Sequence, residues 1–213
     1  MSRMVRDPLQ LRSRETLERV AAATERLLEE RTFEEITIGE ILREARCSSG
    51  SFYARFGSKD ALLPFLYERY DAQLRPRLEA RLARAPWGEM TFRDACATLV
   101  RGTLEMYLER RNLMRALALY ARTHPEAFSD SFYQQRREVQ ELPLAVLRPF
   151  LAHIPHPAPE AALRMGFFVV ACAAREKLLF GDAPHAAVTP VTVDGLTREL
   201  THVLHSYLAT PPP

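Results

Sequence analysis

Apolar residues recur every three or four positions along most of the chain, a spacing that predicts α-helices. The first such face lies between residues 13 and 30. Its members are Leu17, Val20, Ala21, Thr24, Leu27 and Leu28. A second face follows at the spacing i, i+3, i+4, i+7, at Ile38, Ile41, Leu42 and Ala45. No stretch alternates as a half-buried strand does, so the pattern predicts an all-α fold.

Helix-start signals divide residues 36–60 into two short helices and the beginning of a third. Thr37 with Glu40 fits a capping box, in which each side chain satisfies a free backbone N–H. Ser48 and Ser58 are suited to cap the next two helices, the later one beginning at Lys59. Two helices joined by a turn as short as Arg46-Cys47 predict a helix-turn-helix, the geometry that places its second helix in a DNA major groove.

These residues resemble the DNA-binding domain of the tetracycline-repressor (TetR) family of bacterial transcriptional regulators. Four segments carry the resemblance: Phe33, residues 37–45, Ser48 to Tyr53, and the run FGSKDAL at 56–62. Two positions depart from the family pattern. Arg46 and Thr32 stand where the family usually has glycine, and a positive φ at either site would cost free energy in a non-glycine residue.

With the resemblance, the helix pattern implies three regions. We expect a helix-turn-helix DNA-binding domain at 1–60, a linking helix at 61–85, and a helical ligand-binding and dimerisation domain at 86–213. Ala85-Pro86-Trp87-Gly88 ends the linking helix and marks the boundary. At the other end, Arg3 and Arg6 belong to an arginine-rich arm, which is either a solvated terminus or a second contact to DNA.

The second helix of the motif predicts how DNA would be bound. If Phe52 and Phe56 point inward, Gly50 and Ala54 point outward. Glycine inside a helix costs up to about 1 kcal/mol relative to alanine, so close approach to the DNA backbone is the simplest reason for Gly50. Tyr53 can donate to a phosphate, and the positions of Thr37 and Lys59 at helix starts favour phosphate as well. The predicted DNA-contact residues are Thr37, Ser48, Ser49, Gly50, Ser51, Tyr53, Ala54, Arg55 and Lys59.

Taken singly, several of these residues have ordinary structural roles: Ser48 as a cap, Tyr53 as a half-buried packing residue, Lys59 as a solvated lysine. Only Arg55 on this face is a strong bidentate reader of bases, so we expect affinity to come largely from phosphates and DNA shape. Residues 1–60 are neutral overall, but positive charges exceed the one acid, Glu44, between 43 and 59. A neutral domain with a local positive face fits a specific DNA contact.

Composition excludes several other classes of protein. The net charge of the 213-residue chain is only +2, and its three cysteines are too far apart for a zinc site or a disulfide framework. No apolar leader or membrane-length run is present, so we expect a soluble, cytoplasmic protein. Gly-rich phosphate loops, GxSxG, HExxH and paired histidine ligands are missing, so we expect no enzymatic activity, no metal and no cofactor.

Two long helices near the C-terminus, at 160–180 and 193–208, are apolar enough to pack against a second chain. In the TetR family the last two long helices dimerise, and two copies are needed to contact two half-sites. The predicted interface residues are Phe167, Val170, Ala171, Ala174, Leu178, Leu196, Leu200, Val203, Leu204 and Tyr207. The alternative is ordinary packing of these helices within one subunit.

The resemblance also implies a small molecule bound among the middle helices. The candidate lining residues are Phe92, Tyr107, Met114, Tyr120, Phe132, Phe168 and Arg175. Arg175 is the most informative, because a cation in an apolar helix needs a carboxylate partner or an exposed edge. Its partner is either a glutamate of its own or a neighbouring chain, or an anionic ligand.

We therefore expect a homodimeric, ligand-responsive DNA-binding regulator, and specifically a repressor that an apolar effector releases from a palindromic operator. The alternative is a helical scaffold or binding protein whose helix-turn-helix has lost DNA reading.

Overall fold

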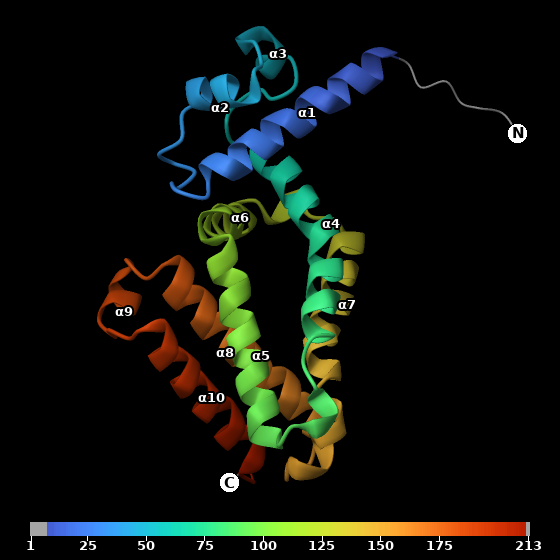
Figure 1. Ribbon diagram of the computed structural model, residues 1–213, viewed down its shortest axis with the longest axis vertical. Coiled ribbons are helices and arrows are strands. Elements are labelled where there is room, and N and C mark those ends of the chain that lie inside the picture. Colours follow the sequence, from blue (N-terminus) through green and yellow to red (C-terminus); the bar gives the residue numbers. More distant parts are fainter. Residues whose placement is uncertain (1–7, 212–213) are drawn as a thin grey trace, which may run out of the picture. The chain divides into compact units, whose positions relative to one another are not determined.

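The computed structural model describes residues 8–211, and the regular structure in this range is entirely helical, as predicted (Figure 1). The α-helices are α1 (Pro8–Leu27), α2 (Ile38–Ala45), α3 (Ser49–Tyr53), α4 (Leu62–Leu82), α5 (Phe92–Glu109), α6 (Arg111–Thr123), α7 (Asp130–Ala145), α8 (Pro159–Leu179), α9 (Pro184–Ala187) and α10 (Val193–Ala209). Three 3₁₀ turns, η1 (Trp87–Glu89), η2 (Pro125–Ala127) and η3 (Arg148–His153), lie between them.

Two compact units make up the chain. The first combines Met1–Asp71 with Asn112–Ala127, and the second combines Ala72–Arg111 with Phe128–Pro213. The division falls inside α4, and α6 belongs to the first unit although it follows α5 in sequence. Sequence reasoning assigned all residues after 86 to one domain and gave no sign that α6 would join the N-terminal helices.

The N-terminal unit is built around α1. Val20, Ile41 and Phe52, from α1, α2 and α3, have no exposed area and form the centre of its core. Arg69 of α4 pairs with Glu18 and Glu25 of α1. At the end of α1, the Asn112 side chain donates to the Leu28 carbonyl at 3.0 Å and so connects α6 to the same helix. In Figure 1, α2 and α3 lie together along one side of α1.

In the C-terminal unit α5, α8 and α10 pack against one another. Gly166 marks the closest approach of α8 and α10, because a Cβ there would lie 2.9 Å from Leu204 Cδ1 and 3.2 Å from Tyr207 Cδ1. The observed bounds of α8 and α10 agree with the two long helices predicted at 160–180 and 193–208. In the part of the chain that the structure describes, none of the helices combines the length and apolar character that crossing a bilayer requires.

Some element starts differ from the predicted ones. The first helix begins at Pro8 rather than near Ser13, and Arg3 and Arg6 of the predicted arm lie outside the described residues. The Ser58 hydroxyl accepts from the Ala61 N–H at 3.2 Å, but α4 begins only at Leu62 rather than at Lys59. The residues between them form turns.

Candidate nucleic-acid interface

The connection between α2 and α3 is a tight left-handed turn. Arg46 ends α2 with φ 49° and ψ 50°, the one non-glycine residue with positive φ in the range that the structure describes. The Cys47 N–H donates to the Leu42 carbonyl at 2.9 Å, which closes the helix end. The predicted conflict at Arg46 is therefore present. Thr32, the other departure from glycine, has no positive φ.

The predicted caps of α2 and α3 are confirmed. The Thr37 hydroxyl accepts from the Glu40 N–H, and the Glu40 carboxylate accepts from the Thr37 N–H at 2.8 Å, which completes the capping box. Ser48 caps α3 by accepting from the Ser51 N–H at 3.2 Å. These bonds orient the two helices, and they also engage as acceptors the Thr37 and Ser48 hydroxyls that were predicted to contact DNA.

The outward face of α3 is small and polar, with one aromatic ring. Phe52 is fully buried and Phe56 is 4% exposed, so the opposite face turns to solvent as predicted. Its exposed residues are Ser49, Gly50, Tyr53 and Ala54. Tyr53 is 51% exposed and meets the Phe52 ring edge-on, with the centroids 5.4 Å apart. A Cβ on Gly50 would meet no atom within 4 Å, so nothing inside the chain requires glycine there.

Arg55 follows α3 and is bonded back to that helix. Its Nη1 donates to the Ser51 carbonyl at 2.6 Å and to the Ser51 hydroxyl at 2.9 Å. Its Nε is buried and has no hydrogen-bond partner. To contact a base with both donors, the guanidinium would first have to leave Ser51. The positive groups exposed beside α3 are instead Arg43 and Arg46 of α2 and its cap.

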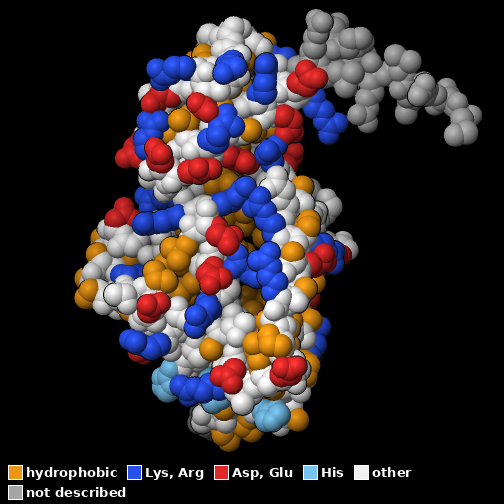
Figure 2. All heavy atoms as spheres, viewed as in Figure 1, with side chains coloured by type: hydrophobic (Ala, Val, Ile, Leu, Met, Phe, Trp, Pro, Cys, Tyr) orange, Lys and Arg blue, Asp and Glu red, His pale blue; other side chains and the backbone are white. Residues whose placement is uncertain are grey.

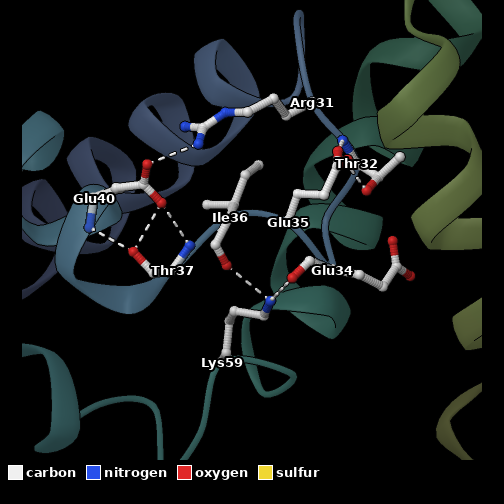
Figure 3. Close-up of polar contacts among 8 residues, drawn as sticks. All are labelled: Arg31, Thr32, Glu34, Glu35, Ile36, Thr37, Glu40 and Lys59. Atoms are coloured by element: carbon white, nitrogen blue, oxygen red, sulfur yellow. Dashed lines mark hydrogen bonds and ion pairs between the residues drawn. The ribbon is translucent and has the colours of Figure 1, made fainter.

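The segment between α1 and α2 contains two successive Thr-x-x-Glu boxes (Figure 3). In the first, which the sequence reading missed, the Thr32 N–H and hydroxyl both donate to Glu35 at 2.8 Å. The second is Thr37 with Glu40, whose other carboxylate oxygen accepts from Arg31 at 2.7 Å. The N–H of Thr37, with Arg31 and the Thr37 hydroxyl, lowers the pKa of Glu40 to about 2. The bond from the Thr32 N–H likewise lowers the pKa of Glu35.

Lys59 closes the same segment from the other side (Figure 3). Its ammonium donates to the carbonyls of Phe33 at 2.7 Å, Ile36 at 2.9 Å and Glu34 at 3.4 Å. It also lies 4.6 Å from the centroid of the Phe33 ring. An ammonium has three N–H donors, and the structure directs those of Lys59 to backbone carbonyls of its own chain. A phosphate contact by Lys59 stays a prediction that competes with these bonds.

Charge over the N-terminal unit is mixed. Figure 2 shows Lys and Arg side chains interspersed with Asp and Glu over its visible face. Ion pairs account for part of this: Arg26 with Glu44 at 2.8 Å, and Arg31 with Glu40. The positive excess expected at 43–59 is therefore reduced to Arg43 and Arg46 as exposed cations near α3, since Arg55 and Lys59 turn inward.

The predicted dimer residues divide into two groups. Six of them are buried within the single chain: Val170, Ala174, Leu178, Leu196, Leu200 and Leu204. Phe167 and Ala171 are half-buried, whereas Val203 and Tyr207 are 46% and 44% exposed. The apolar side chains that α8 itself turns to solvent are Met165, Phe168 and Val169, which are 52%, 61% and 43% exposed. These three were not in the predicted interface.

The predicted ligand residues also separate. Met114 and Tyr120 lie on α6 in the N-terminal unit, and the other five lie in the C-terminal unit. Phe168 is exposed on α8, and Phe92 stacks on Phe150 with centroids 5.6 Å apart. Tyr107, Phe132 and Arg175 come from α5, α7 and α8. The predicted lining residues therefore divide between the two units, and their role in ligand binding stays a prediction.

An all-α protein with an exposed helix-turn-helix has the architecture that many DNA-binding regulators share. Comparison with known families narrows the class: residues 20–64 match the family "Bacterial regulatory proteins, tetR family". No curated protein sequence matches the chain.

Solved structures match over nearly the whole chain. A TetR-family transcriptional regulator from Mesorhizobium loti has a TM-score of 0.61 at 16% identity, covering 93% of this chain and 97% of its own. Another from Pectobacterium atrosepticum has a TM-score of 0.61 at 20% identity, covering 97% and 100%. A TetR-like regulator from Rhodococcus sp. RHA1 has a TM-score of 0.57 at 19% identity, covering 91% and 96%. The chain therefore contains a TetR-family helix-turn-helix domain and has the fold of TetR-family transcriptional regulators.

Proposed function

We propose that this chain is a homodimeric transcriptional repressor that binds a palindromic operator through α3 and is released by a small apolar effector. The observation that carries the DNA-binding part is the outward face of α3. It is rigidly capped by Ser48, it exposes Tyr53, and it has at Gly50 a point where another molecule's backbone can approach without meeting a side chain.

The chemistry of this face favours phosphate contacts and DNA shape over direct base readout. Ser49 and Tyr53 can donate to phosphate oxygens, and the exposed Arg43 and Arg46 add charge beside them. Arg55, the side chain best suited to bind a guanine, is bonded to Ser51 in the free protein. We therefore expect strong salt dependence and modest discrimination at any single base pair.

The need for a dimer follows from the spacing of the two half-sites on the DNA. One chain carries one recognition helix, and two half-sites lie roughly 34–36 Å apart, so two copies are required. The apolar strip of Met165, Phe168 and Val169 on α8, with Val203 and Tyr207 on α10, is the surface we assign to the second copy. Packed against its symmetry mate, this strip forms a four-helix arrangement of the kind that two-fold dimers use.

Release by an effector requires that ligand and DNA favour different conformations of the dimer. The coupling free energy for such proteins is typically about 1–3 kcal/mol, enough to change operator affinity from several-fold to more than a hundred-fold. The sign proposed here, repression, means that the unliganded dimer binds the operator.

An electrophoretic mobility shift with DNA from upstream of the protein's own coding region tests the DNA-binding part. A saturable shift that weakens steeply with salt supports it. Tyr53→Phe should weaken the shift several-fold, whereas Tyr133→Phe, which removes a hydroxyl from another exposed tyrosine, should not. Failure to find any saturable, salt-sensitive shift would leave the helical scaffold protein as the better description.

A further inference from the structure

A charged group without a carboxylate partner lies inside the C-terminal unit. Arg175 of α8 is half-buried, and its Nε is buried without a hydrogen-bond partner. Its Nη2 reaches only the Cys172 sulfur, at 3.8 Å. Sulfur is a weak acceptor, so this contact does not compensate a guanidinium charge removed from water.

Acids on the helices of the same unit are bonded to other arginines. On α5, Glu105 and Glu109 bind Arg81, and on α7 Glu138 approaches Arg75. Glu141 of α7 binds Arg148 and Arg164. Glu176, which follows Arg175, has interactions of its own. The glutamate partner that the sequence left open for Arg175 is therefore not found within the described part of the chain.

A second polar group faces the same region. Tyr107 of α5, a helix that packs against α8, is 8% exposed. Burial raises the pKa of this hydroxyl, and the charge of Arg175, with a smaller contribution from Arg136 of α7, acts in the opposite direction. The charges of two guanidinium groups, on α7 and α8, thus act on one buried phenol of α5.

Apolar residues flank these groups along their helices. One turn before Tyr107, Leu104 is 1% exposed, and beside Arg175 on α8 Ala174 is fully buried. Arg136 lies 5.9 Å from the ring of Phe132, so that ring borders the same side of α7. A ligand that fits here presents an anion to Arg175 and an apolar body to its neighbours.

We propose that Arg175 and Tyr107 bind the carboxylate of the effector, so that the effector is a carboxylic acid with an apolar body rather than a neutral apolar molecule. A carboxylate offers two acceptor oxygens, one for a guanidinium edge and one for a phenol O–H. This inference rests on the proposed regulatory function for its biological role, but the binding site itself can be tested without DNA.

The test uses matched pairs of probes: decanoate with 1-decanol, and 2-naphthoate with 2-naphthol. Calorimetry or thermal shift with the full-length protein should show saturable binding of at least one acid, and much weaker binding of its alcohol. Arg175→Met should weaken acid binding roughly ten- to a hundred-fold, the contribution of one charge-assisted hydrogen bond. Arg175→Lys should recover part of the loss, and Tyr107→Phe should weaken the acid without affecting the alcohol.

Arg198→Met is the matched control, because Arg198 is exposed on α10 of the same unit. It should leave acid binding unchanged. Thermal unfolding of Arg175→Met should occur no earlier than that of the wild type, since the variant loses an uncompensated charge. Three results would each overturn the proposal. They are equal affinity for acid and alcohol, no saturable binding of either acid, and an Arg175→Met variant that binds the acid normally.

The DNA experiment separates this inference from the proposed function. If an acid binds at Arg175 but the protein shifts no DNA, the proposed repressor function is wrong and the anion site stands. If the protein shifts DNA but binds neither acid, the regulatory function stands and the carboxylate effector is wrong.

Discussion

The ammonium of Lys59 donates to the carbonyl oxygen of Phe33 at 2.7 Å and lies 4.6 Å from the centroid of the Phe33 ring. Lys177, in the C-terminal unit, behaves alike: its ammonium donates to the carbonyls of Ala186 at 2.5 Å and Thr189 at 2.7 Å. These are the only two lysines among 29 basic Lys and Arg residues. An ammonium directs three donors tetrahedrally, which suits several converging carbonyls better than a planar guanidinium does.

Removal of the Lys59 ammonium should loosen the segment between α1 and α2. Lys59→Met leaves the carbonyls of Phe33 and Ile36 without their donor, and we expect the free energy of unfolding to fall by about 1–3 kcal/mol. Lys59→Arg should recover little of it. Denaturant unfolding, followed by circular dichroism, measures the change.

Lys177→Met is the control for DNA affinity, since it removes the same charge from the other unit. If Lys59 acts only inside the fold, the slope of log affinity against log salt stays the same in both variants. A slope reduced by about one in Lys59→Met, without loss of stability, would instead indicate a phosphate contact.

Acid should weaken the N-terminal unit through Glu40. Its pKa is about 2 in the folded chain against an ordinary 4.5, so it stabilises the fold above pH 4.5 and loses this contribution as the pH falls toward 2. Glu40→Gln keeps a capping-box partner but loses the charge that pairs with Arg31. We expect the variant to be less stable than the wild type at pH 7 and equal to it below pH 2. A constant difference across this range, measured by denaturant unfolding, would contradict the assignment.

Local signals in the sequence predicted the motif, while long-range packing was beyond them. Thr37-Glu40, Ser48 and the pair Phe52 and Phe56 act within one or two turns, so spacing alone identified their roles. The internal bonds of Lys59 join residues more than twenty positions apart, and no periodic pattern encodes them.

The apolar faces of α8 and α10 show the same limit. Helical spacing showed apolar residues on two faces of α8 and on one face of α10, but it could not say which face meets the core. The structure turns Val170 and Leu204 inward and Phe168 outward. Which face covers which helix depends on the tertiary arrangement of α5, α8 and α10, which the sequence pattern does not contain.

Replacement of Arg46 by glycine should raise stability and lower DNA affinity. A left-handed conformation costs a non-glycine residue roughly 1–2 kcal/mol, so Arg46→Gly should raise the free energy of unfolding by about that amount. The same change removes an exposed cation beside α3 and should reduce the salt slope of operator binding by about one. Arg43→Ala removes a charge from the same surface without relieving strain, so it should change the slope and not the stability. A destabilised Arg46→Gly protein would contradict the strain argument.

Replacement of Gly50 by alanine should stabilise the protein but weaken its binding to DNA. A Cβ at this helical position meets nothing, so Gly50→Ala should stabilise the free protein by up to about 1 kcal/mol. If the glycine exists for close approach of DNA, the same methyl group should weaken operator binding at least several-fold. Gly88→Ala, at an equally open and exposed glycine in η1, is the control and should leave DNA binding unchanged. Undiminished operator affinity in Gly50→Ala would remove the reason assigned to the glycine.

The assignment of the dimer surface depends on Phe168. At 61% exposure it is the most exposed aromatic side chain on α8, and a charge there would be buried without a partner if two copies pack through this strip. Phe168→Glu should therefore weaken the dimer by more than ten-fold while leaving the monomer folded. Val188→Glu, at a side chain that is 78% exposed just after α9, should leave it intact. Light scattering after size-exclusion chromatography distinguishes the two. If Phe168→Glu stays dimeric, the second copy must pack on another face, and the separation of the two recognition helices must be derived again from that face.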